Sequence, residues 1–303
     1  MKRIYIFIII CLMSANSIKA QRQDYSTHEF SVFILGGISN INSKFKEVSP
    51  DVNGRELEIL GSQYYHFSKA KRNGGFGGGI GFNYIYNIDE QFAIVTGLEF
   101  LTYASKLQID ESSEEYLSTD YDGDEFILKY FLEKYNEKQT AVIFSIPLMV
   151  KYTTPFPNSS IKYFVSGGLK LGFPFSAKAT ITPGAVSTAG YYEFEDRLYK
   201  NLWEHGFING APGDQTKSNI KLGVAAIISV ETGVRIPISF SKDLILGVYL
   251  NYNPNSIQKI NNNHVLEYQS LTPDVFIYKS ALNSGMIKNV NLFSTGLKVG
   301  IKF

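Results

Sequence analysis

Apolar and polar residues alternate along most of this chain with a period of two. The clearest stretch is 220–236, where one face is apolar and the other carries glycine, serine and isolated charges. Because successive strand side chains point to opposite sides, this pattern predicts a β-strand. The same pattern predicts strands at 29–37, 76–86, 92–100, 142–152, 163–175, 244–252 and 293–303, eight in all. The facing of the first strand stays ambiguous because both of its faces are apolar.

The composition of the two faces distinguishes a membrane barrel from a soluble sandwich. A soluble sandwich also alternates, but it turns a charged face to water. Here the apolar face is continuous, with Tyr or Phe toward the strand ends, and the opposite face is rich in Gly and Ser. A lipid-facing band with aromatic girdles has this arrangement. The pattern therefore favours strands that cross a membrane.

Connection lengths support the same interpretation. Three connections are short, at 87–90, 153–160 and 237–242, and they alternate with four long ones at 38–73, 107–138, 180–219 and 253–288. Short periplasmic turns alternating with long outer loops are typical of outer-membrane barrels. We therefore expect an all-β fold: a closed antiparallel transmembrane β-barrel of about eight strands with long extracellular loops.

The first twenty residues have the composition of an export signal. Lys2 and Arg3 precede an apolar stretch at 4–13, and Ala20 supplies the small residue preferred at a cleavage site. The alternative is a membrane anchor, but the apolar stretch is about half the length that a bilayer requires. We expect a signal peptide at 1–20, a barrel domain at 21–303, and export to the bacterial outer membrane. Cys11 is the sole cysteine, so the mature chain lacks disulfides and thiolate sites.

Isolated charges on the inward face are the candidate site residues. A charge in a narrow barrel needs an opposite partner, because burying it alone is costly. The strand directions place one set at mid-depth and a second set near the periplasmic mouth. We predict a lumen charge network and a set of mouth charges, with Lys170 as the closest candidate partner of Glu231 by register and Lys298, two strands away, able to share it across the lumen. The network is Glu99, Lys170, Glu231 and Lys298, and the mouth charges are Lys151, Lys162, Arg235 and Lys302.

The rest of the sequence offers little catalytic chemistry. The acidic stretch 110–125 only loosely resembles a calcium loop, since Glu125 stands where an EF-hand has glycine. A solvated acidic loop is the simpler interpretation, and divalent-ion bridging to anionic lipopolysaccharide is the alternative. No nucleophile accompanies the four histidines in sequence, and phosphate, zinc and dinucleotide motifs are missing. We expect no enzyme activity, no catalytic or metal site and no cofactor, and the net charge of +1 gives no reason to expect nucleic acid.

Several short motifs resemble the PorT-like outer-membrane β-barrel family of Bacteroidetes-type bacteria. They are the stretches 96–100, 145–152 and 167–172, and the final strand ending at Phe303. The resemblance spans the mature chain and implies fold and localisation but little about activity. A terminal aromatic on an amphipathic last strand predicts that Phe303 is an assembly signal. The expected partners are outer-membrane lipid and lipopolysaccharide, the barrel-assembly machinery, and an unidentified protein partner of the loops.

We expect a structural or surface-interaction role carried by the extracellular loops, with a lumen plugged by side chains, since an eight-stranded interior is about filled by side chains. The first alternative is a narrow channel or carrier for small solutes, and the second is an outer-membrane enzyme.

Overall fold

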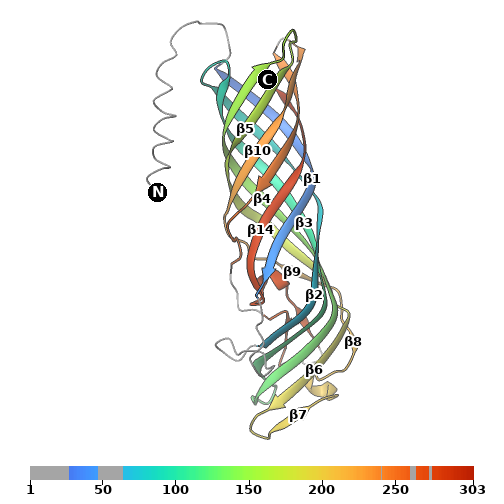
Figure 1. Cartoon of the computed structure of the whole chain (residues 1–303). Helices are drawn as coiled ribbons and strands as arrows, with labels where there is room; N and C mark the ends of the chain where they lie inside the picture. Colours follow the sequence, from blue (N-terminus) through green and yellow to red (C-terminus); the bar gives the residue numbers. More distant parts are fainter. Residues whose placement is uncertain (1–26, 47–63, 240, 260–263, 273–274) are drawn as a thin grey trace, which may run out of the picture.

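Eight long antiparallel strands close into a ring (Figure 1). The computed structural model describes residues 27–46, 64–239, 241–259, 264–272 and 275–303. Each strand pairs with the next, and β14 returns to β1 from Ser31↔Lys302 to Phe45↔Ile287. The predicted closed barrel of eight strands is therefore confirmed. The strands are β1 (His28–Phe45), β2 (Tyr64–Asn87), β3 (Phe92–Thr119), β4 (Glu125–Pro155), β5 (Lys162–Thr182), β10 (Ala225–Ser239), β11 (Lys242–Tyr252) and β14 (Ile287–Lys302).

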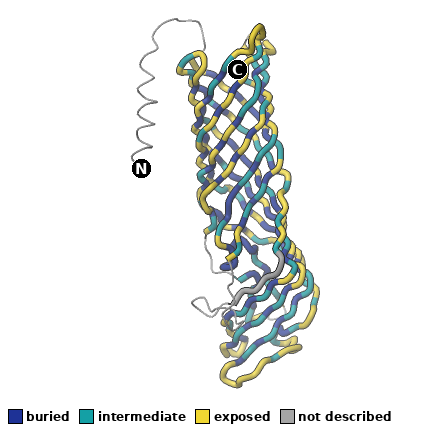
Figure 2. Tube along the Cα trace, in the orientation of Figure 1, coloured by how far each residue is buried: buried dark blue, intermediate teal, exposed yellow. Residues whose placement is uncertain are grey.

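Burial alternates along the barrel strands, which gives the crossed pattern of Figure 2. The facing of the first strand is now defined. Phe30, Val32 and Ile34 point outward, with 44%, 44% and 59% of their surface exposed, whereas Phe33 and Leu35 are buried in the lumen. The Phe33 ring fills the space beside Gly81, where an added Cβ would lie 2.3 Å from the ring. Gly81 therefore makes room for an aromatic ring inside the barrel.

The strands on one side extend far past the ring, so the predicted boundaries of the long connections are wrong. β3 runs to Thr119 and β4 begins at Glu125, which leaves only a turn where the sequence suggested a loop from 107 to 138. Asp120 holds this turn by accepting hydrogen bonds from the backbone N–H groups of Asp122 (3.0 Å) and Asp124 (2.9 Å).

The extended β3–β4 hairpin and the strands paired with it form a small sheet, here called the arm. It comprises residues 111–133 and 185–212 and continues past one end of the barrel (Figure 1). β6 pairs with residues Ile127 to Leu132 of β4, and β7 and β8 pair with β6. The added elements are β6 (Ala185–Tyr192), β7 (Arg197–Tyr199), the 3-10 helix η1 (Trp203–His205) and β8 (Ala211–Pro212), while β9 (Thr216–Asn219) pairs with β5.

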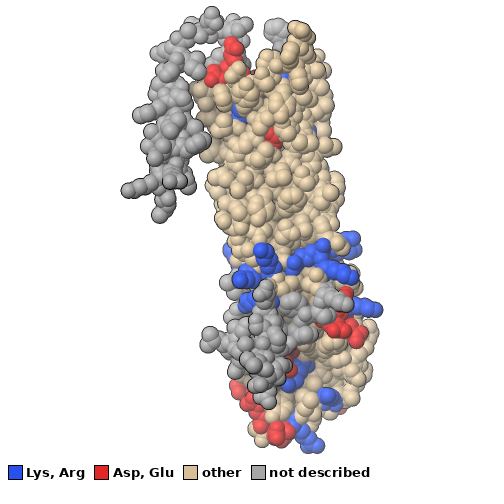
Figure 3. Space-filling model, viewed as in Figure 1, with Lys and Arg blue, Asp and Glu red and all other residues tan. Residues whose placement is uncertain are grey.

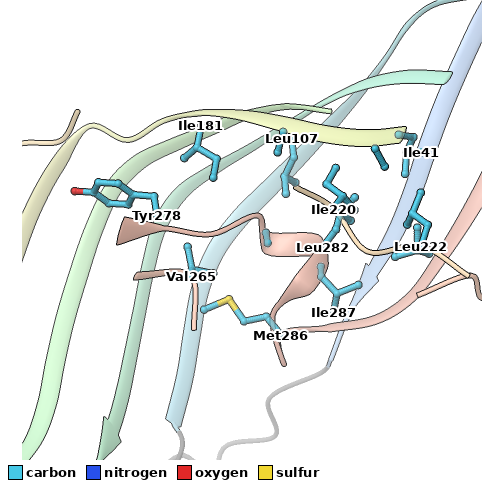
Figure 4. Packing of buried hydrophobic residues seen from close by; sticks show 14 of the residues in the cluster. Ile41, Leu107, Ile181, Ile220, Leu222, Val265, Tyr278, Leu282, Met286 and Ile287 are labelled. Carbon is cyan, nitrogen blue, oxygen red and sulfur yellow. The ribbon is translucent and has the colours of Figure 1, made fainter. Parts of the chain in front are cut away.

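The end of the barrel nearest the arm is covered by residues 264–272 and 275–287, here called the cap. The cap contains β12 (Leu266–Glu267), β13 (Ile277–Tyr278) and the 3-10 helix η2 (Ala281–Asn283). Its apolar side chains pack against the barrel wall in one cluster (Figure 4). Leu282, Met286 and Ile287 are at most 3% exposed, beside Leu107 and Ile181 of the wall. Burial of this apolar surface holds the cap in place.

No helix in the described part of the chain has the length and hydropathy of a membrane span.

Candidate functional site

The four mid-depth charges predicted from the sequence lie together in the lumen. Lys170 Nζ donates to Glu99 Oε2 at 2.8 Å and Oε1 at 3.0 Å, and to Glu231 Oε1 at 3.3 Å. Lys298 Nζ donates to Glu231 Oε2 at 2.5 Å. All four side chains are at most 4% exposed. The ion pairs run from Glu99 to Lys170, then to Glu231 and then to Lys298. Negative and positive groups alternate along this series, so each buried charge has at least one opposite partner.

Both lysines predicted beside Glu231 contact it, but which of the two lies closer differs from the sequence prediction. Lys298, and not Lys170, is the closest partner of Glu231. Lys298 reaches from β14 past β11 to β10, because the inward faces of a closed ring converge. Its Nζ also lies 3.8 Å from the centroid of the Phe33 ring, a cation–π contact. Lys170 of β5 pairs mainly with Glu99 of β3, two strands away on the other side of β4.

A second ion cluster closes the end of the lumen opposite the arm. Arg235 Nη2 lies 2.7 Å from Asp243 and 3.2 Å from Glu29, and Lys302 Nζ lies 3.2 Å from Glu29. Sequence reasoning predicted the two cations but missed both acids. Glu29 falls in the strand of ambiguous facing, and Asp243 directly follows the turn into β11.

The other two predicted mouth residues behave differently. Lys151 is 5% exposed and lies between the two ion clusters, with Nζ 4.8 Å from the centroid of the Phe164 ring. A cavity of about 20 Å³ beside it has room for about one water molecule. Lys162 is exposed at the rim and forms no ion pair within the described residues. The structure therefore brings Arg235 and Lys302 together and leaves Lys162 apart.

The other half of the lumen is filled by uncharged side chains. Tyr103 and Tyr249 are buried, and beyond them Ile143, Ile227 and Leu107 join the apolar cluster that the cap completes. Two ion clusters, an aromatic layer and an apolar layer thus follow one another along the barrel axis. The lumen is packed along its length.

Glu137 fastens the cap to the barrel wall. Its carboxylate accepts hydrogen bonds from the hydroxyls of Ser280 and Tyr135, the backbone N–H of Ala281 (2.9 Å) and the side chain of Gln139 (3.1 Å). Burial raises the pKa of the Glu137 carboxyl, and these four donors oppose that shift. Sequence reasoning did not single out Glu137, because its donors Ser280 and Ala281 lie more than 140 residues later in the chain.

The acidic stretch 110–125 is not the solvated loop that the sequence suggested. Most of it is strand, and Glu114 is 1% exposed. Glu114 accepts from Tyr130 Oη at 2.5 Å and contacts His264 Nδ1 at 2.5 Å, while the His264 ring stacks on Tyr116 with centroids 3.5 Å apart. Burial raises the pKa of Tyr130 well above its ordinary value. These contacts join the cap to the arm, and the described residues contain no group of three or more His, Cys, Asp or Glu that could hold a metal ion.

Phe303, the predicted assembly signal, follows the last strand and continues its outward face. Its backbone N–H donates to the Phe30 carbonyl at 2.8 Å, and its side chain is 49% exposed in phase with Val299 and Ile301. The ring therefore stands at the end of the apolar band, opposite the arm.

We expect Phe303→Ala to lower the yield of folded protein in the membrane several-fold, because an exposed aromatic at the end of the last strand is the predicted recognition element. Heat-modifiable gel mobility of membrane fractions measures the yield. Phe175→Ala removes an equally outward ring at the other end of the band and serves as the matched control. Equal yields for the Phe303 and Phe175 variants would contradict the assembly role.

Comparison with known proteins agrees with this architecture. Residues 19–253 match the family described as outer membrane protein beta-barrel domain. No curated protein matches the sequence. Solved structures that resemble this chain include Neisserial surface protein A, at 10% identity over 91% of this chain and 96% of that one, with a TM-score of 0.32. Another is the outer membrane protein OprG from Pseudomonas aeruginosa, at 12% identity over 90% and 95%, with a TM-score of 0.29. The barrel assignment rests on the hydrogen-bonded ring and the family match.

Proposed function

Since this chain belongs to the outer membrane protein beta-barrel domain family, we propose that it is a non-conducting outer-membrane barrel that presents the arm outside the cell as a binding element. The packed lumen is the observation that carries the proposal. An ion path needs a continuous file of water, and the two ion clusters, the tyrosine layer and the cap each interrupt it. The short connections lie at the opposite end from the arm, which supports the arm facing outward.

Planar bilayers test the closed lumen. Purified protein inserted into a bilayer should give no stepwise conductance, because buried ion pairs and apolar side chains fill the barrel along its length. A general porin inserted under the same conditions provides the positive control. Steady steps of uniform size from this protein would overturn the proposal and favour a channel.

A groove on the arm indicates what kind of partner would bind. It encloses about 550 Å³ near the β3–β4 turn. Its apolar lining includes Leu117 and Phe194, which are 56% and 66% exposed. Among the described residues that line it, the charged ones are the acids Asp124, Glu125 and Glu193. Exposed apolar side chains rimmed by carboxylates suit a polypeptide segment that carries both cationic and apolar side chains.

Two model peptides test this partner chemistry. One alternates arginine and leucine, and the other alternates glutamate and leucine. We expect only the arginine peptide to bind, in a salt-sensitive manner, and to lose at least about fivefold in affinity with the variant Glu193→Gln, Phe194→Ser. Both residues are exposed, so the fold should tolerate the change. Fluorescence anisotropy of labelled peptide measures binding, and Glu204→Gln with Leu271→Ser is the matched control. Unchanged affinity of the groove variant would contradict the proposed partner.

Three finer assignments belong to the same proposal. The motifs at 96–100, 145–152 and 167–172 support a PorT-like barrel of Bacteroidetes-type bacteria. The order of basic, apolar and small residues supports a signal peptide at 1–20, which lies outside the described residues and which N-terminal sequencing of the mature protein tests. The role that we propose is binding and involves no catalytic step.

A further inference from the structure

Three lysines line up across neighbouring strands on the outer face of the sheet. Lys106 of β3 lies directly opposite Lys138 of β4. Lys138 lies opposite Thr180 of β5, and Thr180 lies opposite Lys217 of β9. We call Lys106, Lys138, Thr180 and Lys217 the lysine row. Residues directly opposite each other in an antiparallel pair have Cβ atoms about 5 Å apart, so the Lys106 and Lys138 side chains are immediate neighbours.

No acid among the described residues balances the positive charge of the lysine row. All three lysines are exposed, and none forms an ion pair with an acid in the part of the chain that the structure describes. The rows on either side add Lys71 and Lys178 and no acid, since Lys71 lies opposite Gln108 and Lys178 opposite Thr140. Asp110, the next acid along β3, accepts a hydrogen bond from Gln108. Like charges directly opposite each other destabilise a sheet, so this arrangement favours an added anion.

The position of the lysine row identifies the source of that anion. On β5 only two residues separate Lys178 from Phe175, an apolar side chain that is 76% exposed at the edge of the apolar band. Figure 3 shows lysine and arginine side chains forming a belt between the uncharged barrel surface and the arm. The belt therefore stands where the headgroups of the outer leaflet would lie if the arm faces outward.

We propose that the lysine row binds the phosphate groups of an anionic lipid of the outer leaflet. Lysine ammonium groups bind phosphate as point charges, and the Thr180 hydroxyl adds a hydrogen-bond donor between Lys138 and Lys217. The acyl chains of the same lipid would lie along the adjoining apolar band, which a free anion in water could not use. The assignment rests on the orientation in the proposed function, with the arm outside.

Vesicles that differ only in lipid phosphate test the proposal. The folded protein is placed in phosphatidylcholine vesicles that contain either bisphosphorylated lipid A or the same lipid after removal of both phosphates, and the urea midpoint of unfolding is measured. We expect the phosphorylated lipid to raise the midpoint of the wild-type protein. The double variant Lys106→Gln, Lys138→Gln should lose more than half of that rise. In the vesicles with dephosphorylated lipid A this variant should be at least as stable as the wild type, because a repulsive pair is gone.

A matched variant separates local from general charge effects. Lys200→Gln with Lys242→Gln removes two exposed lysines away from the lysine row, and it should keep the full rise in midpoint. Equal rises for both double variants would overturn the proposal, as would no rise in the wild type. Inorganic phosphate added to the vesicles with dephosphorylated lipid A should give no rise in the midpoint, and an equal rise there would overturn the lipid assignment. A conducting lumen would overturn the proposed function and leave these outcomes unchanged.

Discussion

Replacing Lys170 by methionine should lower the unfolding free energy of the barrel by about 3 to 5 kcal/mol. Lys170 is fully buried between two carboxylates, with Nζ 2.8 Å from Glu99 and 3.3 Å from Glu231. Methionine fills a similar volume but leaves Glu99 without its cation. Glu231 keeps Lys298, so the loss should fall mainly on Glu99. Urea unfolding of the protein in lipid vesicles measures the change.

Second substitutions identify the source of that loss. Adding Glu99→Gln to Lys170→Met should recover part of the stability, because the second change removes the uncompensated charge. Lys162→Met, on the same strand but exposed at the rim, should change the unfolding free energy by less than about 0.5 kcal/mol. If the effects of Lys170→Met and Glu99→Gln simply add, then the two residues are not coupled and the network does not act as a unit.

The alternation of side chains allowed much of the barrel to be predicted from the sequence. Seven of the strands have one apolar and one small or charged face, and the structure retains their number and, within the barrel strands, their facing. The strand predicted at 220–236 is shorter, because β10 begins at Ala225, and Ile220 and Leu222 are buried in the apolar cluster and do not face lipid. The first strand is apolar on both faces, since Phe33 points inward to cover Gly81 while Phe30 and Val32 point outward. Periodicity cannot orient such a strand. The contact between Phe33 and Lys298 shows why its inner face is apolar.

The local sequence pattern does not predict which side chains meet across the lumen or in the arm. Strand neighbours suggested Lys170 for Glu231, but the closed ring brings Lys298 nearer from two strands away. The alternating pattern did not predict that β3 continues to Thr119, because Ser112 and Glu114 are polar although they occupy buried positions of the strand, where the pattern requires apolar residues. Glu114 is accommodated there by His264, which is 150 residues distant. Such partners become visible only when the fold brings distant segments together.

The cap offers a separate test, because the Glu137 carboxylate adds buried hydrogen bonds to the apolar packing that holds the cap to the wall. We expect Glu137→Ala to destabilise the docked cap by about 3 kcal/mol. The change removes the acceptor for the Ala281 N–H and the Ser280 and Tyr135 hydroxyls, all buried. Tyr135 retains the Lys279 carbonyl as an acceptor, so the cost arises mainly at Ser280 and Ala281. Hydrogen exchange at the amides of residues 277–287 measures the loss of docking.

The barrel and the cap should respond differently to Glu137→Ala. The backbone pairing that closes the ring of eight strands does not use this carboxylate, and neither ion cluster includes it, so heat-modifiable gel mobility should stay unchanged while exchange in the cap accelerates. Planar bilayers that contain this variant should show no stepwise conductance, because the Lys170 network still closes the lumen. Glu125→Ala, an exposed acid on the same strand, is the matched control and should leave exchange in the cap unaltered. Wild-type exchange rates in the Glu137 variant would show that apolar packing alone holds the cap.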